Sequence, residues 1–273
     1  MIKQVEIPQS DWLSEHLKQN SISKNADKGI EGTRVFNLIP KGYSSILKIF
    51  HWMHVNSEQL PNDIKWDDIT ELKKDKNDVW EKLLKESTLS YSTLGTENSN
   101  AERISWETVS TMLGVKFNST INPNVFLKHF NNSFPTWLFG AEEGTLTERE
   151  ISIVLEILNT NYANSNFYFH FELLKLIPSG LNPLPEELRF SGDIQDLPRF
   201  LSYEKGPFSI WMTPDYFWPE RREFCFCTDY DMPYSILATN DNSLIDNFMN
   251  SELECFEINY DDRLDFGSYN ESL

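Results

Sequence analysis

The chain has 273 residues, with 42 acidic and 24 basic side chains and a formal net charge of -18. Phosphate backbones and anionic membranes recruit proteins through lysine and arginine, so this charge argues against a nucleic-acid-binding or membrane-surface protein. The hydrophobic content of 40% is that of a folded chain and argues against a disordered one. An acidic surface maintains solubility, and it also speeds association with a basic protein or a cationic ligand.

The start of the chain, its apolar runs and its cysteines give an expectation about location. Residues 1–8 lack the basic region and apolar run of a secretory signal. No apolar run approaches the roughly 18 residues that span a bilayer. Cys225, Cys227 and Cys255 are an odd number, which argues against a disulfide framework. We therefore expect a soluble cytoplasmic protein whose cysteines are reduced, structural and not metal ligands.

In chain order, the first predicted elements are a strand and a helix. Tyr43–Val55 is rich in β-branched and aromatic residues and apolar on both faces, which is typical of a central strand. A helix is predicted over Trp106–Leu113, with Ser105 as its N-cap and Gly114 as its stop. Polar or proline-rich composition predicts loops over residues 20–33, 87–102 and 177–187.

The strongest helix prediction covers Thr147–Asn159. Thr147 and Glu150 form a capping box, in which the hydroxyl accepts the amide three residues on and the carboxylate accepts the cap amide. Leu155 belongs to the apolar stripe that follows the cap.

The second half of the chain is richer in predicted strands. We expect strands at Phe167–Leu174, Arg199–Tyr203, Phe224–Thr228 and Leu253–Ile258, and a short helix at Ser243–Asn250. The predicted fold is therefore α+β, with a helix-rich N-terminal half and a mainly antiparallel sheet with flanking helices in the C-terminal half. One globular domain over residues 1–273 is expected. Two lobes, about 1–135 and about 136–273, remain an open alternative.

The segment from Arg199 to Tyr234 contains eleven aromatic residues. Rings this dense usually form core. Residues 212–219 contain two prolines, however, which predicts a loop, and a loop of this kind cannot bury all its rings. We therefore predict a binding surface that includes Trp211, Tyr216 and Trp218.

Two carboxylates, Asp229 and Asp231, are set on one side of a predicted strand end. Paired carboxylates share a proton, bind a divalent cation or hold an arginine. An ion pair with Arg222 is the structural interpretation, and a pocket that contains all three residues is the functional one. Arg222, Asp229 and Asp231 therefore complete the candidate binding site.

No catalytic, metal-binding or cofactor motif is recognisable in the chain. The five histidines do not fit zinc spacings such as HExxH, and His51 and His54 face opposite sides of a predicted strand. No GxGxxG, GxxxxGKS/T or GxSxG sequence occurs. The sequence therefore predicts no catalytic residue, no metal and no cofactor, and it favours a binding protein over an enzyme.

Four segments resemble a bacterial protein family that has no established activity: Tyr43–His51, Ile104–Leu113, Glu143–Leu146 and Trp218–Asp231. The family pattern for the last segment is Trp-Pro-x-Asp-Arg-x-Trp-Cys-x-x-Thr-Glu-x-Asp. Trp218, Arg222 and Asp231 fit this pattern, whereas Arg221 stands where the family has an aspartate. The resemblance covers about two thirds of the chain, and it implies a single bacterial fold without a mechanism.

Two hypotheses from different classes follow. The first is an acidic protein-binding module, of the immunity-protein or antitoxin kind, that masks a basic toxin. The second is an enzyme or a small-ligand-binding protein with a pocket near Trp218, Arg222, Asp229 and Asp231. A convex aromatic surface would favour the first hypothesis, and a concave site with a perturbed carboxylate would favour the second.

Overall fold

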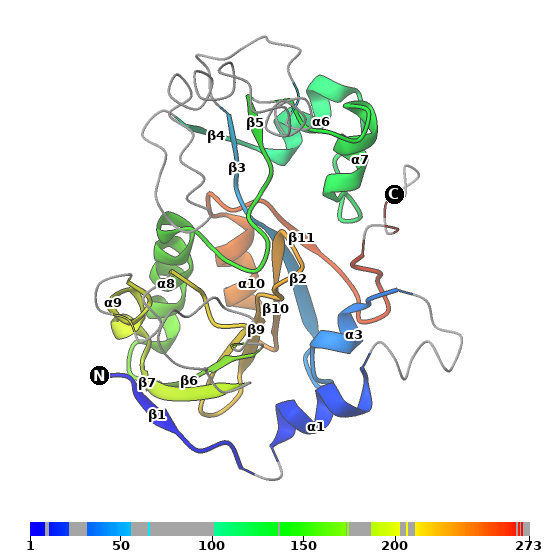
Figure 1. Cartoon of the computed structure of the whole chain (residues 1–273). Helices are drawn as coiled ribbons and strands as arrows, with labels where there is room; N and C mark the ends of the chain where they lie inside the picture. The colour runs from blue at the N-terminus through cyan, green and yellow to red at the C-terminus, as the bar shows by residue number, and fades with distance from the viewer. Residues whose placement is uncertain are drawn as a thin grey trace, which may run out of the picture.

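An eight-stranded antiparallel sheet lies at the centre of the computed structural model (Figure 1). The structure describes residues 1–8, 11–21, 32–55, 65, 101–135, 137–172, 174, 187–202, 206, 211–265, 267 and 269. In spatial order, the strands of the large sheet are β1 (Lys3–Val5), β7 (Leu188–Asp193), β6 (Asn166–Phe171), β8 (Tyr216–Pro219), β9 (Phe224–Cys227), β10 (Tyr234–Thr239), β2 (Ser45–Phe50) and β11 (Cys255–Glu257).

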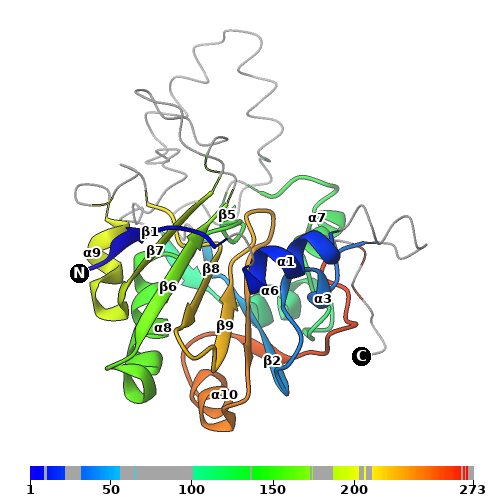
Figure 2. The same cartoon turned by 90° about the horizontal axis from the view of Figure 1, so that it is seen from below.

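The two faces of this sheet bury different side chains, because successive residues of a strand point to opposite sides. On one face, Phe167 and Phe169 of β6 pack in a core with α8, α9 and α10. On the other face, Cys225 and Cys227 of β9 pack in a core with α1 and α3. Figure 2 shows α1 and α3 on the side of the sheet opposite to α8. The helices are α1 (Trp12–Gln19), α3 (Val35–Leu38), α8 (Glu148–Tyr162), α9 (Leu197–Leu201), which follows the 3-10 turn η3 (Ile194–Asp196), and α10 (Asn242–Met249).

A smaller sheet with its own helices extends from one end of the large sheet. Its strands, in the order β4 (Glu102–Ile104), β3 (Met53–Val55) and β5 (Leu138–Phe139), pack against α6 (Trp106–Leu113) and α7 (Pro123–His129). Phe50, the last residue of β2, contacts the Trp106 ring at 5.0 Å between centroids. Because the chain continues from β2 directly into β3, the packing around Phe50 connects the large sheet to the smaller one.

The capping predictions for the two best helices are confirmed. The Thr147 hydroxyl accepts the Glu150 amide at 3.2 Å, and the Glu150 carboxylate accepts the Thr147 amide at 2.8 Å. The helix continues to Tyr162, three residues beyond the predicted end. In α6, the Ser105 side chain accepts the Thr108 amide, and Gly114 ends the helix at φ +67°, where a side chain would be strained.

Other predictions about the elements need correction. The α+β class and the antiparallel sheet are confirmed, but the first half is not simply helix-rich, because it supplies β1 to β4. The predicted strand Tyr43–Val55 divides into β2 and β3, which belong to different sheets. Residues 199–201 of the predicted strand Arg199–Tyr203 lie in helix α9.

Some predictions lie outside the described residues. Most of the predicted loops at 20–33, 87–102 and 177–187 fall there. In the part of the chain that the structure describes, no helix combines the length and the apolar composition needed to cross a bilayer.

Candidate functional site

The aromatic residues predicted to form a binding surface are buried. Trp211, Tyr216 and Trp218 are 3%, 2% and 2% exposed. Trp218 lies edge-on to Trp12, with 5.4 Å between ring centroids, and is stacked with Tyr168 at 5.8 Å. The expectation of an exposed aromatic loop is therefore wrong, because residues 216–219 form strand β8 with large side chains on both faces of the sheet.

Arg222 does not form the predicted ion pair with Asp229 or Asp231. It precedes the four-residue strand β9, whereas both aspartates follow it, so they lie at opposite ends of the sheet. The Arg222 guanidinium instead stacks over the Trp12 ring at 5.0 Å. The proposed pocket of Trp218, Arg222, Asp229 and Asp231 is therefore not assembled.

The turn after β9 presents an exposed aromatic residue between two carboxylates. Asp229 Oδ1 accepts the Asp231 amide at 3.0 Å, and the Asp229 carbonyl accepts the Met232 amide at 3.1 Å. This is the aspartate-stabilised turn that the Asp-x-Asp sequence favours. The side chain between the carboxylates, Tyr230, is 51% exposed. Tyr230 was not among the predicted binding residues, although a ring at the centre of a polar turn is a signal that the sequence contains.

A second acidic segment docks against this turn. The Gly144 amide donates to the Met232 carbonyl at 3.0 Å. Gly144 has φ +69°, and a Cβ there would lie 2.5 Å from Tyr230 Cα, so only glycine allows this approach. The docking brings Glu143 close enough to Asp231 for their charges to interact. We call Glu143, Asp229 and Asp231 the acidic rim.

The carboxylates at this end of the sheet are electrostatically unfavourable. Burial, together with repulsion from Asp231 and Glu172 and against one backbone hydrogen bond, raises the pKa of Asp229 to about 6. Burial, with repulsion from Glu172 and Asp229, holds the pKa of Asp215 well above its ordinary value. Among the described residues, no lysine or arginine forms an ion pair with Glu143, Asp215 or Asp229.

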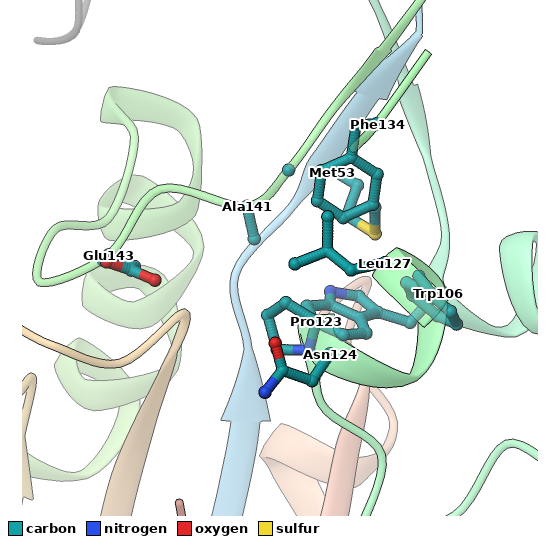
Figure 3. Close-up of a pocket in the computed structure, with 10 residues that line it drawn as sticks. Met53, Trp106, Pro123, Asn124, Leu127, Phe134, Ala141 and Glu143 are labelled. Atoms are coloured by element: carbon teal, nitrogen blue, oxygen red, sulfur yellow. The ribbon is translucent and has the colours of Figure 1, made fainter. Parts of the chain in front are cut away.

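A largely apolar cavity of about 250 Å³ adjoins the acidic rim. Figure 3 shows Glu143 on one side of it, across from Trp106 and Leu127. Asn124 is a further polar group in the lining. The apolar walls are formed by Met53, Trp106, Pro123, Phe126, Leu127, Phe134 and Ala141. The cavity therefore suits an apolar or aliphatic group that carries a positive charge at the Glu143 side.

A buried chain of polar groups resembles a nucleophile and a base in its distances. His51 Nε2 lies 2.9 Å from Ser235 Oγ, which lies 2.9 Å from Thr228 Oγ1, and His51 Nδ1 lies 2.7 Å from the Glu142 carbonyl oxygen. The side chains of His51, Ser235 and Thr228 are at most 1% exposed. They are therefore out of reach of a substrate, and they fix the Glu142 segment to the end of the sheet.

A buried lysine, also missed in the sequence, serves a similar purpose. Lys48 in β2 is 1% exposed, and its Nζ donates to the carbonyls of Ser119 and Ile121, each at 3.0 Å. The ammonium lies 4.1 Å from the Tyr234 ring centroid. Burial lowers the pKa of Lys48 to about 7. These contacts attach the segment before α7 to the large sheet.

A mixed group of histidine and carboxylates lies at the same end of the sheet as Asp215. His170, Glu172 and Glu187 each place one potential ligand atom within 4.8 Å of the others. Behind them, Arg189 donates to both carboxylate oxygens of Asp11, at 2.5 and 2.8 Å. His170, Glu172 and Glu187 have the chemistry and spacing of metal ligands.

Comparison of the chain with protein-family models, with curated proteins and with solved structures gave no match. The geometry of the site is therefore the basis for a function. That geometry combines an acidic rim, an exposed tyrosine and an apolar cavity, all next to one another.

Proposed function

We propose that this protein binds a basic protein through Tyr230, the acidic rim and the adjoining cavity. The observation that carries the proposal is the placement of Tyr230, whose ring is 51% exposed at the tip of a turn between two carboxylates. Tyrosine is enriched among the residues that dominate binding energy at protein interfaces. Flanking carboxylates give such a ring a preference for lysine and arginine on the partner.

The electrostatics of the rim support this proposal. Carboxylates whose pKa values are raised by burial and mutual repulsion destabilise the free protein at neutral pH. A cation placed among them relieves that repulsion, and this relief adds to the free energy of binding. Perturbed groups of this kind are typical of functional sites.

The cavity supplies the apolar part of the proposed interaction. A lysine or arginine side chain has an aliphatic stem and a charged head, and it covers apolar surface while its head stays in a polar environment. The apolar walls around Trp106 and Leu127 suit the stem, and Glu143 suits the head.

In this proposal, the protein is a cytoplasmic module of the immunity-protein or antitoxin kind. The net charge of -18 attracts a basic toxin from a distance and speeds encounter. The contacts around Tyr230 then set how long the complex persists.

Affinity capture from the native host, with wild-type protein as bait, tests the proposal. The captured partner is purified and titrated against wild type and against Tyr230→Ala, with Met112→Ala as the matched control because Met112 is 58% exposed on α6. We expect Tyr230→Ala to weaken binding by on the order of 2 kcal/mol, and Met112→Ala to leave it unchanged.

Salt provides the second arm of this experiment. Screening at about 0.1 M salt limits the reach of exposed charges to about 10 Å, so affinity should fall as salt is raised. A partner whose affinity is indifferent to salt and to Tyr230→Ala would contradict the proposal.

The cavity also supports a second candidate, a small organic amine as the ligand. Ala141→Trp fills the cavity, because Ala141 forms part of its wall. The variant should abolish stabilisation of the fold by such an amine in thermal melts. Amines that stabilise wild type and this variant equally would remove the second candidate.

A further inference from the structure

Two glutamates lie just beyond the paired ends of β6 and β7. The strands are antiparallel, with His170 opposite Arg189 and Phe171 opposite Leu188. The next pair in this register is Glu172 and Glu187. Like charges directly across a strand pair are destabilising, so a cation between them would be stabilising.

His170 completes the group from the same face of β6. Because side chains alternate along a strand, residues 170 and 172 point to the same side. The His170 side chain is completely buried, whereas Glu172 and Glu187 are 34% and 45% exposed. The group therefore has an imidazole at its base and two carboxylates at an opening to solvent.

Two of the three distances in this group match a metal shell as well as they match long hydrogen bonds. His170 Nε2 lies 3.4 Å from Glu172 Oε1 and 3.5 Å from Glu187 Oε2. Good N–H to O hydrogen bonds have donor–acceptor distances of about 2.7–3.2 Å. Ligands about 2.1 Å from a tetrahedral metal are separated by about 3.4 Å.

The surrounding charges also favour a cation. Arg189 is already matched by Asp11, with hydrogen bonds of 2.5 and 2.8 Å. Asp215 adds a further carboxylate next to the group, since its Oδ2 accepts the Glu172 amide at 2.7 Å. In the described chain, the carboxylates of Glu172 and Glu187 lie within ion-pair distance of the His170 ring and of no lysine or arginine.

We propose that His170, Glu172 and Glu187 bind a divalent transition-metal ion of the Zn²⁺ class. One imidazole and two carboxylates suit Zn²⁺, Mn²⁺ or Fe²⁺, whereas Mg²⁺ and Ca²⁺ prefer all-oxygen shells. Three protein ligands leave a coordination position open, as in sites that act on a bound water or ligand. This proposal is independent of the one concerning Tyr230, because it involves different residues and a different ligand.

Coordination has a defined consequence for the imidazole ring. The metal requires an unprotonated Nε2, so the ring proton moves to Nδ1, which lies 3.5 Å from Arg189 Nη2. Arg189 can only donate, so with the proton on Nδ1 two donors face each other, and the two carboxylates of Glu172 and Glu187 have to outweigh this opposing contact.

Titration of the full chain with Zn²⁺ and with Co²⁺, after dialysis against a chelator, tests the proposal. We expect one equivalent of either metal to bind and to raise the thermal midpoint. Glu172→Gln and Glu187→Gln should each lower the affinity by at least about tenfold. The control is Glu220→Gln, because Glu220 is exposed at the opposite end of β8.

An excess of Mg²⁺ separates this site from loose binding to acidic surface. Mg²⁺ occupies surface carboxylates but competes poorly for an imidazole, so Zn²⁺ binding should persist in its presence. Zn²⁺ binding that Mg²⁺ abolishes would overturn the proposal. So would an affinity that is unchanged in both glutamine variants, or no stoichiometric binding of either metal.

Discussion

At the scale of single residues, Trp218 illustrates how completely the sheet encloses its aromatic side chains. Trp12 and Tyr168 contact its ring, and the Arg189 guanidinium lies over it at 5.0 Å from the centroid. The ring is 2% exposed. Its role is therefore to pack α1 against the sheet.

Trp218→Ala should destabilise the protein by roughly 3–5 kcal/mol, because it leaves a cavity lined by rings. Arg222→Ala removes an exposed stacking partner of Trp12 and should cost about 1 kcal/mol or less. Urea unfolding of both variants measures the contrast. Similar small losses in both would show that the Trp218 ring is not packed as described.

The three thiols should differ in reactivity, because Cys225 and Cys227 are buried and Cys255 is partly buried. Burial raises the pKa of all three thiols, that of Cys255 to about 12. Thiol titration of the native protein should therefore modify Cys255 slowly, and the other two only on unfolding. Rapid modification of two thiols in the native state would contradict this expectation, and Cys255→Ser identifies which thiol reacts first.

His51 should make stability depend on pH. Burial lowers its pKa from the ordinary 6.5 to about 4. The unfolded chain binds a proton at His51 near pH 6.5, whereas the folded protein binds it only near pH 4. The contribution of His51 to stability is therefore complete above pH 6.5. It is lost as the pH falls toward 4, by up to about 3 kcal/mol.

The variant His51→Gln isolates this effect. It loses the hydrogen bonds of the imidazole, so it should be less stable than wild type at pH 7.5. The difference in unfolding free energy should shrink as the pH falls to about 4.5. A difference that stays constant over this range would mean that His51 does not titrate in this way.

At the scale of elements, α8 depends on its cap and on its apolar stripe to different degrees. Thr147→Ala exposes first-turn amides and should cost about 0.5–2 kcal/mol. Leu155→Ala opens a core cavity and should cost about 2–5 kcal/mol. Exposed Glu156→Ala is the control and should change the free energy of unfolding by at most about 0.5 kcal/mol. Equal losses from all three variants in urea melts would contradict this description of α8.

The elements that the sequence predicts well carry their own signals. The capping box of α8 and the Ser105 and Gly114 signals of α6 are local, and the structure confirms them. Strands β1, β3 and β4 have three residues each, which is too short for an alternation of apolar and polar residues to be recognised. Strand β8 is apolar on both faces, which hides the alternation that identifies a strand.

The candidate site was only partly predictable, because its parts come from distant segments. Asp229 and Asp231 were found from their spacing, but Glu143 joins them through the docking of Gly144. Glu172 meets Glu187 only through the pairing of β6 with β7. No pattern in a single sequence encodes such tertiary neighbours.

At the scale of the whole molecule, acidic side chains gather where several strands of the large sheet end. Glu172 and Asp229 follow β6 and β9, while Glu187 and Asp215 precede β7 and β8. The antiparallel order brings all four to the same end. The net charge of -18 is thus concentrated in part at one place, where it costs stability.

Asp229→Asn tests whether this end trades stability for binding. Because the pKa of Asp229 is raised from its ordinary 3.8 to about 6, its ionisation is less favourable in the folded protein than in the unfolded chain. The contribution of this group is most favourable below pH 3.8 and is lost as the pH rises through 6. Asparagine keeps the oxygen that accepts the Asp231 amide but cannot ionise. At pH 8 the variant should therefore be more stable than wild type by about 1–3 kcal/mol, and the gain should disappear near pH 4.

The same variant should bind the proposed basic partner more weakly, since it removes a charge from the acidic rim. Asp246→Asn, at an exposed position of α10, removes an equal charge elsewhere and serves as the control. Urea unfolding at pH 8 and pH 4, together with titration of the partner, measures both effects. A rim that exists for binding gives a more stable and weaker-binding Asp229→Asn, with Asp246→Asn close to wild type in both respects. A rim with only a structural role would give a variant that is no more stable at pH 8 and binds as wild type does.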